Sequence, residues 1–195
     1  MLDTAFPKLK LKNKLLLPIV QGGMGVGISA HGLAGSVARL GAVGTISSVD
    51  LRRHHPDLMA RTDKTRDKAL INEVNLIALD REIRAAQAIA EGKGVIAVNV
   101  MRAVAEYAAY VRQSCESGAD AIVVGAGLPM DLPELTSEFP DVALIPILSD
   151  ARGISLILKK WMRRKRLPDA IVIENPQYAA CLLYTSDAAD DLLCV

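Results

Sequence analysis

The sequence predicts an α/β fold built around a parallel sheet, either a doubly wound open sheet or a (β/α)8 TIM barrel. Continuous apolar runs alternate with helical segments six times along the chain. Strands that are apolar throughout, rather than at every second residue, are typical of parallel sheets covered by helices on their faces. In both architectures ligands bind at the carboxyl ends of the strands.

Composition limits the class of protein. The chain has 195 residues, 51% of them hydrophobic, which suffices for one sizeable core and is short for two domains. A net charge of +1 gives no overall preference for nucleic acid or an anionic membrane. The N-terminus lacks the order of a signal peptide, and no apolar run reaches the ~20 residues of a membrane span. The three cysteines are widely spaced and predict neither disulfides nor a metal site, so we expect a cytoplasmic protein.

The elements follow from hydrophobic spacing and from glycines that end helices. Alternating lysine and leucine at residues 8–17 predict a strand or a hairpin that enters the fold. The expected strands lie within residues 16–20, 43–48, 95–101, 120–127, 142–148 and 170–174, the first of them buried on both faces. The expected helices are residues 30–40, 70–90, 103–117, 151–166 and a short piece at 132–139, with a polar loop at 50–68.

A glycine-rich stretch, residues 15–29, is the strongest candidate for a ligand seat. The apolar run ends in four glycines, Gly22, Gly23, Gly25 and Gly27. Without Cβ atoms, this end of the strand admits another backbone or a flat ligand at close range. Ser29 is a suitable cap for a helix that begins near Ala30.

A dinucleotide-binding fingerprint is one alternative for this stretch. Residues 25–30 fit G-x-G-x-x-G/A, and Asp50 follows 25 residues after Gly25, at the end of the next strand. The fit is imperfect, because four residues separate the apolar run from the first glycine of the fingerprint.

A second alternative comes from a resemblance. The segments PIVQGGMGVGIS, LAGSVARLGAVGTISS, VIAVNVM, DAIVVGAGLP and IPILSDAR occur in this order over residues 15–178. Together they resemble the nitronate monooxygenase family of FMN-dependent TIM barrels, which also includes FMN-dependent enoyl-acyl-carrier-protein reductases. The resemblance implies the N-terminal portion of a (β/α)8 barrel, residues 1–180, with about six βα units. It also implies FMN as cofactor and oxidation of alkyl nitronates by O2 to a carbonyl compound and nitrite.

The resemblance places the cofactor site at the carboxyl ends of the strands. Its implied FMN-binding residues are Gly22, Gly23, Met24, Asn99, Gly125, Ala126, Ser149 and Glu174. The residue types alone also allow other roles for three strand-end residues. Asn99 suits a strand-end residue that bonds to nearby backbone, and Ser149 and Asp150 suit helix caps.

The catalytic residue is unknown from this sequence. The family pattern continues after residue 174 to a glycine pair and a catalytic histidine, which would lie beyond residue 180. His31, at a helix N-terminus, does not replace it, nor do His54 and His55, which we expect to be solvated. We therefore expect activity in a longer parent protein, and this chain alone to be an inactive fragment. A small-molecule nitronate and O2 are the implied partners, and the sequence leaves the oligomeric state open.

The last segment, residues 181–195, does not continue the pattern. Residues 181–191 match one reading frame of the transposase adapter used in sequencing libraries, residue for residue. We expect this tail to be non-native and exclude it from the fold. Cys115 is then the one native cysteine, and we expect it to be buried and inert. The basic end of helix 151–166 is expected to be an outer helix end rather than a nucleic-acid patch.

Overall fold

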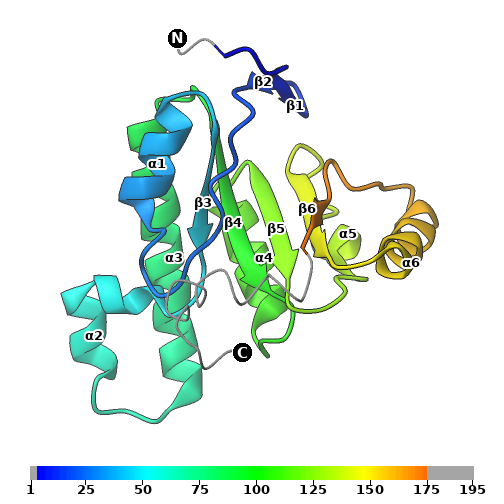
Figure 1. Cartoon of the computed structure of the whole chain (residues 1–195). Helices are drawn as coiled ribbons and strands as arrows, with labels where there is room; N and C mark the ends of the chain where they lie inside the picture. The colour runs from blue at the N-terminus through cyan, green and yellow to red at the C-terminus, as the bar shows by residue number, and fades with distance from the viewer. Residues whose placement is uncertain (1–3, 175–195) are drawn as a thin grey trace, which may run out of the picture.

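A computed structural model describes residues 4–174, and they form a curled parallel half-barrel (Figure 1). The strand order is β3-β4-β5-β6-β7, all parallel. Their bounds are Val43–Ser47, Val95–Met101, Ala121–Gly125, Ala143–Leu148 and Val172–Ile173. Helix α1 (His31–Arg39) precedes β3, and the strands are connected by helices that include α3 (Lys68–Ala90), α4 (Tyr107–Glu116), α5 (Leu132–Leu135) and α6 (Ala151–Met162). This α/β architecture is that of a partial TIM barrel, as the sequence predicts.

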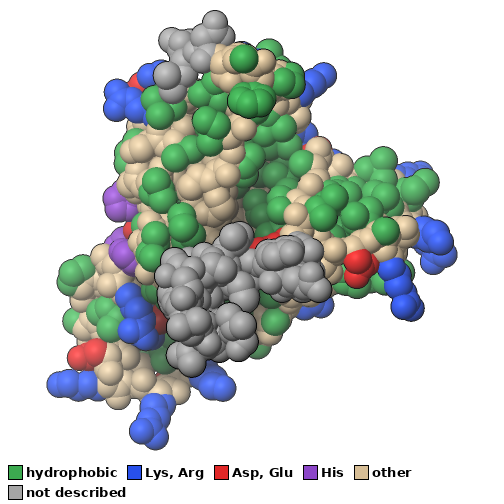
Figure 2. All heavy atoms as spheres, viewed as in Figure 1, with side chains coloured by type: hydrophobic (Ala, Val, Ile, Leu, Met, Phe, Trp, Pro, Cys, Tyr) green, Lys and Arg blue, Asp and Glu red, His purple; other side chains and the backbone are tan. Residues whose placement is uncertain are grey.

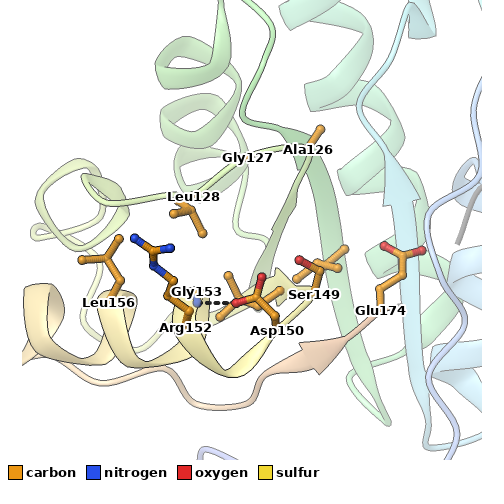
Figure 3. A pocket seen from close by; sticks show the side chains of 11 residues that line it. Ala126, Gly127, Leu128, Ser149, Asp150, Arg152, Gly153, Leu156 and Glu174 are labelled. Atoms are coloured by element: carbon orange, nitrogen blue, oxygen red, sulfur yellow. Dashed lines mark hydrogen bonds between the residues drawn. The ribbon is translucent and has the colours of Figure 1, made fainter. Parts of the chain in front are cut away.

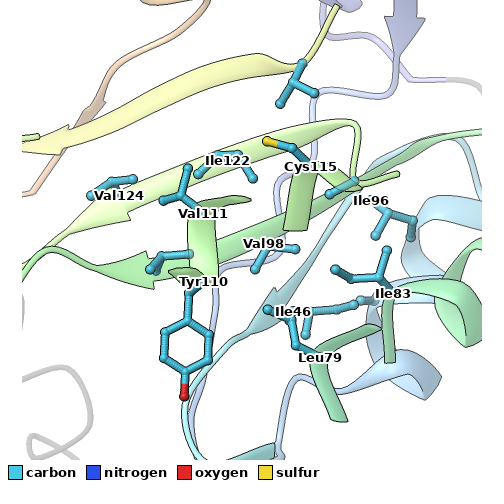
Figure 4. Packing of buried hydrophobic residues seen from close by; sticks show 14 of the residues in the cluster. Ile46, Leu79, Ile83, Ile96, Val98, Tyr110, Val111, Cys115, Ile122 and Val124 are labelled. Atoms are coloured by element: carbon cyan, nitrogen blue, oxygen red, sulfur yellow. The ribbon is translucent and has the colours of Figure 1, made fainter. Parts of the chain in front are cut away.

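The strands are apolar throughout because both faces of the sheet are covered. Ile46, Val98 and Ile122 face the helices and pack with residues of α3 and α4 such as Ile83 and Val111 (Figure 4). Their neighbours in sequence point to the inner face and form a second cluster, which includes Val43, Val95, Ala97, Ala121, Val123, Ala143 and Ile145. Alternate residues of each strand therefore serve two different cores.

The lysine–leucine segment forms a hairpin that closes the amino-terminal end of the half-barrel. Strands β1 (Leu9–Leu11) and β2 (Lys14–Leu16) pair antiparallel. Leu11 and Leu16 are buried in the inner cluster. The Lys14 ammonium donates to the Gly94 carbonyl at 2.6 Å and to Asp120 Oδ1 at 2.9 Å. Leucines thus fill the end of the barrel while lysines bond to the loops before the strands.

The expected strand at residues 16–20 is the main correction. Only one isolated bridge, Val20 to Val43, continues the sheet on that side within the described residues. Leu16 and Leu17 are buried as predicted, but Ile19 and Val20 are each 53% exposed, so the prediction of burial is wrong for the second half of the segment. Pro18 has no N–H to donate, and the segment has only β3 as a strand neighbour among the described residues.

Other boundaries differ by a few residues. The expected loop at 50–68 contains the 3-10 helix η1 (Leu51–His54) and helix α2 (Pro56–Thr62). The helix expected from residue 103 begins at Tyr107, and the one expected to reach 166 ends at Met162. No helix within residues 4–174 has the length and apolar character to cross a membrane. The tail predicted to be non-native, 181–195, lies outside the described residues.

Candidate functional site

The glycine-rich segment lies directly against the carboxyl end of β4. A Cβ placed on Gly23 would be 2.6 Å from Asn99 Cβ and 2.8 Å from its Nδ2. Real Cβ atoms do not approach this closely, so only glycine permits the contact. Gly25 lies similarly against the end of β3, where an added Cβ would be 3.3 Å from Ser47 Oγ. Two of the residues predicted to bind FMN, Gly23 and Asn99, are therefore neighbours.

The side-chain amide of Asn99 has no hydrogen-bond partner within residues 4–174. The side chain is half-buried. Only its backbone is engaged, with the Asn99 carbonyl accepting from Ser48 N at 3.1 Å. The alternative role, bonding to local backbone, is thus not seen for this side chain. A half-buried amide that offers both a donor and an acceptor suits the polar edge of a bound ring.

The loop that carries Met24 is closed by a serine. Met24 N donates to Ser29 Oγ at 2.7 Å, and Ser29 N donates to the Met24 carbonyl at 3.0 Å. The predicted capping role of Ser29 is wrong, because its hydroxyl is already bonded within the loop. The N-cap position of α1 is Ala30 instead. Gly22, at the start of this loop, is exposed, and a Cβ added to it would meet no atom within 4 Å.

A hollow of about 480 Å³ lies further along the same edge, at the ends of β5, β6 and β7 (Figure 3). Three predicted residues line it: Ala126, Ser149 and Glu174. Gly125 lies just inside, where an added Cβ would be 3.1 Å from Ile147 Cδ1. The walls also include residues that the sequence analysis did not select, Leu128, Arg152 and Leu156. They lie on the segments that follow the carboxyl ends of strands. Their position after a predicted strand could have identified them from the sequence.

Backbone and helix-cap geometry shape this hollow. Ala126 has a φ of 55°, the left-handed conformation that turns the chain sharply after β5. Asp150 Oδ1 accepts from Gly153 N at 2.6 Å, so Asp150 is the N-cap of α6. Ser149 is exposed in the hollow and is not the cap. Of the two residues proposed as caps, only Asp150 has that role.

The Asp50 carboxylate pairs with neighbouring arginines, so it is not available to bond to the ribose of a dinucleotide. Its carboxylate bonds to Arg52 Nε at 2.9 Å and also to Arg53 Nε. Burial raises the pKa of Asp50, but the hydrogen bonds and charges of Arg53 and Arg52 outweigh this and leave it below the ordinary value. This arrangement removes the acidic residue that the dinucleotide fingerprint requires.

The histidines surround a buried carboxylate that the sequence analysis missed. Glu82, on α3, is 1% exposed. His31 Nδ1 lies 2.7 Å from Glu82 Oε2, and His55 Nε2 lies 3.1 Å from Oε1. The prediction that His55 is solvated is wrong, since its side chain is only 18% exposed. Glutamate within a helical pattern gives no sequence signal for such burial, because the partners come from distant segments.

The open, curled parallel sheet, with helices on its outer face, defines a partial α/β barrel. More closely, the chain belongs to the nitronate monooxygenase family, whose model matches residues 7–178. Members of this family are generally flavin-dependent oxidoreductases.

Comparison with solved structures supports the fold. The structure of FabK from Thermotoga maritima aligns with a TM-score of 0.56 and 17% identity, over 80% of this chain and 40% of that one. The chain therefore spans less than half the length of that FabK structure. Nitroalkane oxidase from Streptomyces ansochromogenes is 15% identical over 80% of this chain and 64% of that one, with a TM-score of 0.34. No curated protein matches.

The residues present fit a flavin. Gly23 brings no side chain to the strand end, and the Asn99 amide, unpartnered among residues 4–174, lies beside it. The hollow adds apolar walls and the polar groups of Ser149 and Glu174. A planar, partly apolar ring with a polar edge needs this combination of surfaces.

Proposed function

We propose that the protein of which this chain is a part is an FMN-dependent oxidoreductase of the nitronate monooxygenase type. The observation that carries the proposal is the contact of Gly23 with Asn99 at the carboxyl end of β4, where the Asn99 amide has no partner among residues 4–174. Family membership and the position of this pair at the binding edge of a barrel both support it.

The proposed site divides into two parts along the edge of the sheet. Gly22, Gly23 and Met24 would lie against the flavin ring, with the Asn99 amide bonding to its polar edge. Gly125 and Ala126 would continue the backbone surface, while Ser149 and Glu174 face the hollow beside them. Five of the eight proposed contacts lie at the ends of β4 to β7 or just after them, and the other three follow the bridge of Val20 to Val43.

The reaction proposed is oxidation of an alkyl nitronate by O2 to a carbonyl compound and nitrite. Bound FMN would supply the redox chemistry of that reaction. The residues between 4 and 174 would bind and orient the ring and exclude water from its face. We assign no catalytic base to these residues, because His31 and His55 are engaged with Glu82.

The test is turnover by the full-length parent protein. We expect a nitronate to be consumed with uptake of O2 and release of nitrite. The alternative is an enzyme like the FMN-dependent enoyl-acyl-carrier-protein reductases of the same family. Such an enzyme would oxidise a nicotinamide nucleotide with an enoyl thioester and leave the nitronate unchanged, and that result would replace the present proposal.

We also propose that residues 1–180 are part of one FMN-binding barrel domain and that residues 181–195 are not native. The family match ends at residue 178, before the segment that resembles the adapter. Sequencing the genomic locus tests this. Codons for a glycine pair, a histidine and further βα units after residue 180 are expected, whereas codons for residues 181–195 followed by a stop would refute it.

A further inference from the structure

Glu82 is a buried carboxylate with a specific set of partners. It lies on α3, and its side chain is 1% exposed. Oε2 accepts a hydrogen bond from the backbone N of His31 at 2.7 Å and lies 2.7 Å from Nδ1 of the same residue. A carboxylate leaves water only at high cost unless such partners compensate. The arrangement therefore fixes His31 relative to α3.

His31 is the first residue of α1, and this helix has no cap of its own. The N-cap residue, Ala30, provides no side-chain hydrogen bond, and the first turn of α1 contains no acidic residue. Glu82 supplies both the acceptor and the negative charge from a different helix. Free N–H groups and the positive end of the helix dipole at an N-terminus favour such an anion.

The residues just before His31 form the glycine-rich loop of the proposed flavin site. Ser29 closes this loop on Met24, and Ser47 N donates to the Ser29 carbonyl at 3.1 Å. The loop is therefore held at its end by three neighbours: the serine bonds, strand β3 and, through His31, Glu82. Removing Glu82 leaves the His31 N–H without its acceptor on α3, while Gly35 of α1 still packs against Ile89.

The segment 51–62 braces the same loop from the other side. Its His55 lies 3.1 Å from Glu82 Oε1, and its His54 packs on Gly27, where an added Cβ would be 1.3 Å from Nε2. Gly27 also has a φ of +72°, which favours glycine. Figure 2 shows histidine side chains at the surface between the regions of α1 and α2. The Glu82 carboxylate thus bonds to the start of α1 and lies beside His55 of the segment 51–62, which forms no hydrogen bond to it within residues 4–174.

We infer that Glu82 is a positioning residue that holds the loop 22–29 in place through its hydrogen bonds to His31 and makes no contact with the ligand. The segment 51–62 acts as the outer support of this loop. The inference rests on the proposed function only in naming the loop as flavin-facing.

The test compares variants of the full-length protein. Glu82→Ala removes the acceptor, Glu82→Gln keeps an uncharged one, and Glu73→Gln is the control. Glu73 lies on the same helix, is 63% exposed and pairs only with Arg61 among the described residues. Two readouts are measured: amide hydrogen exchange without FMN, and FMN affinity by quenching of flavin fluorescence.

In Glu82→Ala we expect amides of Met24, Ser29 and His31 to exchange about tenfold faster, since a charge-assisted bond is lost, while amides of β4 keep their rates. FMN affinity should fall by about tenfold as well, because a displaced loop misplaces its contacts. Glu82→Gln should recover part of both effects, and Glu73→Gln should match the wild type.

Unchanged exchange of the loop amides in Glu82→Ala would overturn the inference, and so would an equal increase in β4. If Glu82→Ala does not fold, Glu82→Gln decides by the same criterion: loop exchange must rise while β4 stays protected. Wild-type protein that binds no FMN but shows the expected exchange pattern would refute the proposed function and leave the positioning role supported.

Discussion

Gly23 and Asn99 are in such close contact that a single methyl group on the glycine would overlap the asparagine side chain. The distance from that methyl carbon to Asn99 Cβ would be 2.6 Å. This contact joins the loop that follows the first apolar run to the end of β4. It also places the Asn99 amide, which has no partner among residues 4–174, at the surface proposed to face the flavin.

The first prediction concerns Gly23→Ala in the full-length protein. The added methyl must push Asn99 or the loop aside, which costs about 1–3 kcal/mol in a packed site. FMN affinity should fall at least tenfold, measured by fluorescence titration. Gly32→Ala is the matched control, since no atom lies within 4 Å of its Cβ position and Gly32 is outside the proposed flavin site. Equal affinities for the two variants would contradict the proposed role of the contact.

The second prediction separates two asparagines. Asn99 has no side-chain bond among residues 4–174, so Asn99→Ala should leave the melting temperature nearly unchanged and weaken FMN binding. Asn75 is buried and accepts from Arg52 N at 3.2 Å. Asn75→Ala should therefore lower stability by about 1–3 kcal/mol, because it leaves a buried donor unpaired. A large stability loss in Asn99→Ala would argue for a structural role instead.

The third prediction concerns the hairpin. Leu16 is 2% exposed in the inner core, and its neighbour Leu15 is 68% exposed. Leu16→Ala should lower the free energy of unfolding by about 2–5 kcal/mol, through lost burial and a cavity. Leu15→Ala should change it by about 0.5 kcal/mol or less. Denaturant unfolding measures both, and similar losses would show that the hairpin does not close the core as described.

The fourth prediction concerns the thiol of Cys115. Burial, with a smaller contribution from Glu116, raises its pKa to about 12. The thiolate is the reactive form, so the thiol should not react with a disulfide reagent near neutral pH in the folded protein. Reaction should begin only when denaturant unfolds the chain. Rapid labelling of native protein at pH 8 would show that the helix does not bury this residue.

The fifth prediction concerns residues 1–195 expressed alone. The described sheet is an open half-barrel, with Ile173 of its last strand 70% exposed. Unpaired strand edges and uncovered apolar residues promote association. We expect this chain to aggregate or to purify without colour. A soluble yellow protein with one flavin per chain would contradict this expectation.

Much of the fold could be predicted from the sequence because the strands carry a strong local signal. The apolar runs at β3, β4, β5 and β6 are confirmed within a few residues, and the lysine–leucine alternation is confirmed as a hairpin. The run around Pro18 is misleading, since its hydrophobicity suggests burial and its position at the sheet edge prevents it. Hydrophobicity reports what a segment can bury, and the presence of a neighbour decides whether it does.

The candidate site, too, could be predicted from the sequence only in part. Glycines, Asn99 and the strand ends could be selected from the sequence, because parallel strands bring their carboxyl ends to one edge wherever the connections lead. The role of Ser29, the capture of Asp50 by arginines and the environment of Glu82 could not. Each depends on a hydrogen bond between polar groups. The spacing of residues in the sequence does not predict the distance or orientation of those groups. The sequence by itself determined the order of elements and the edge at which the strands end, because both follow from local hydrophobic patterns. The tertiary structure alone decided that Glu82, 51 residues from His31, accepts a hydrogen bond from the start of α1.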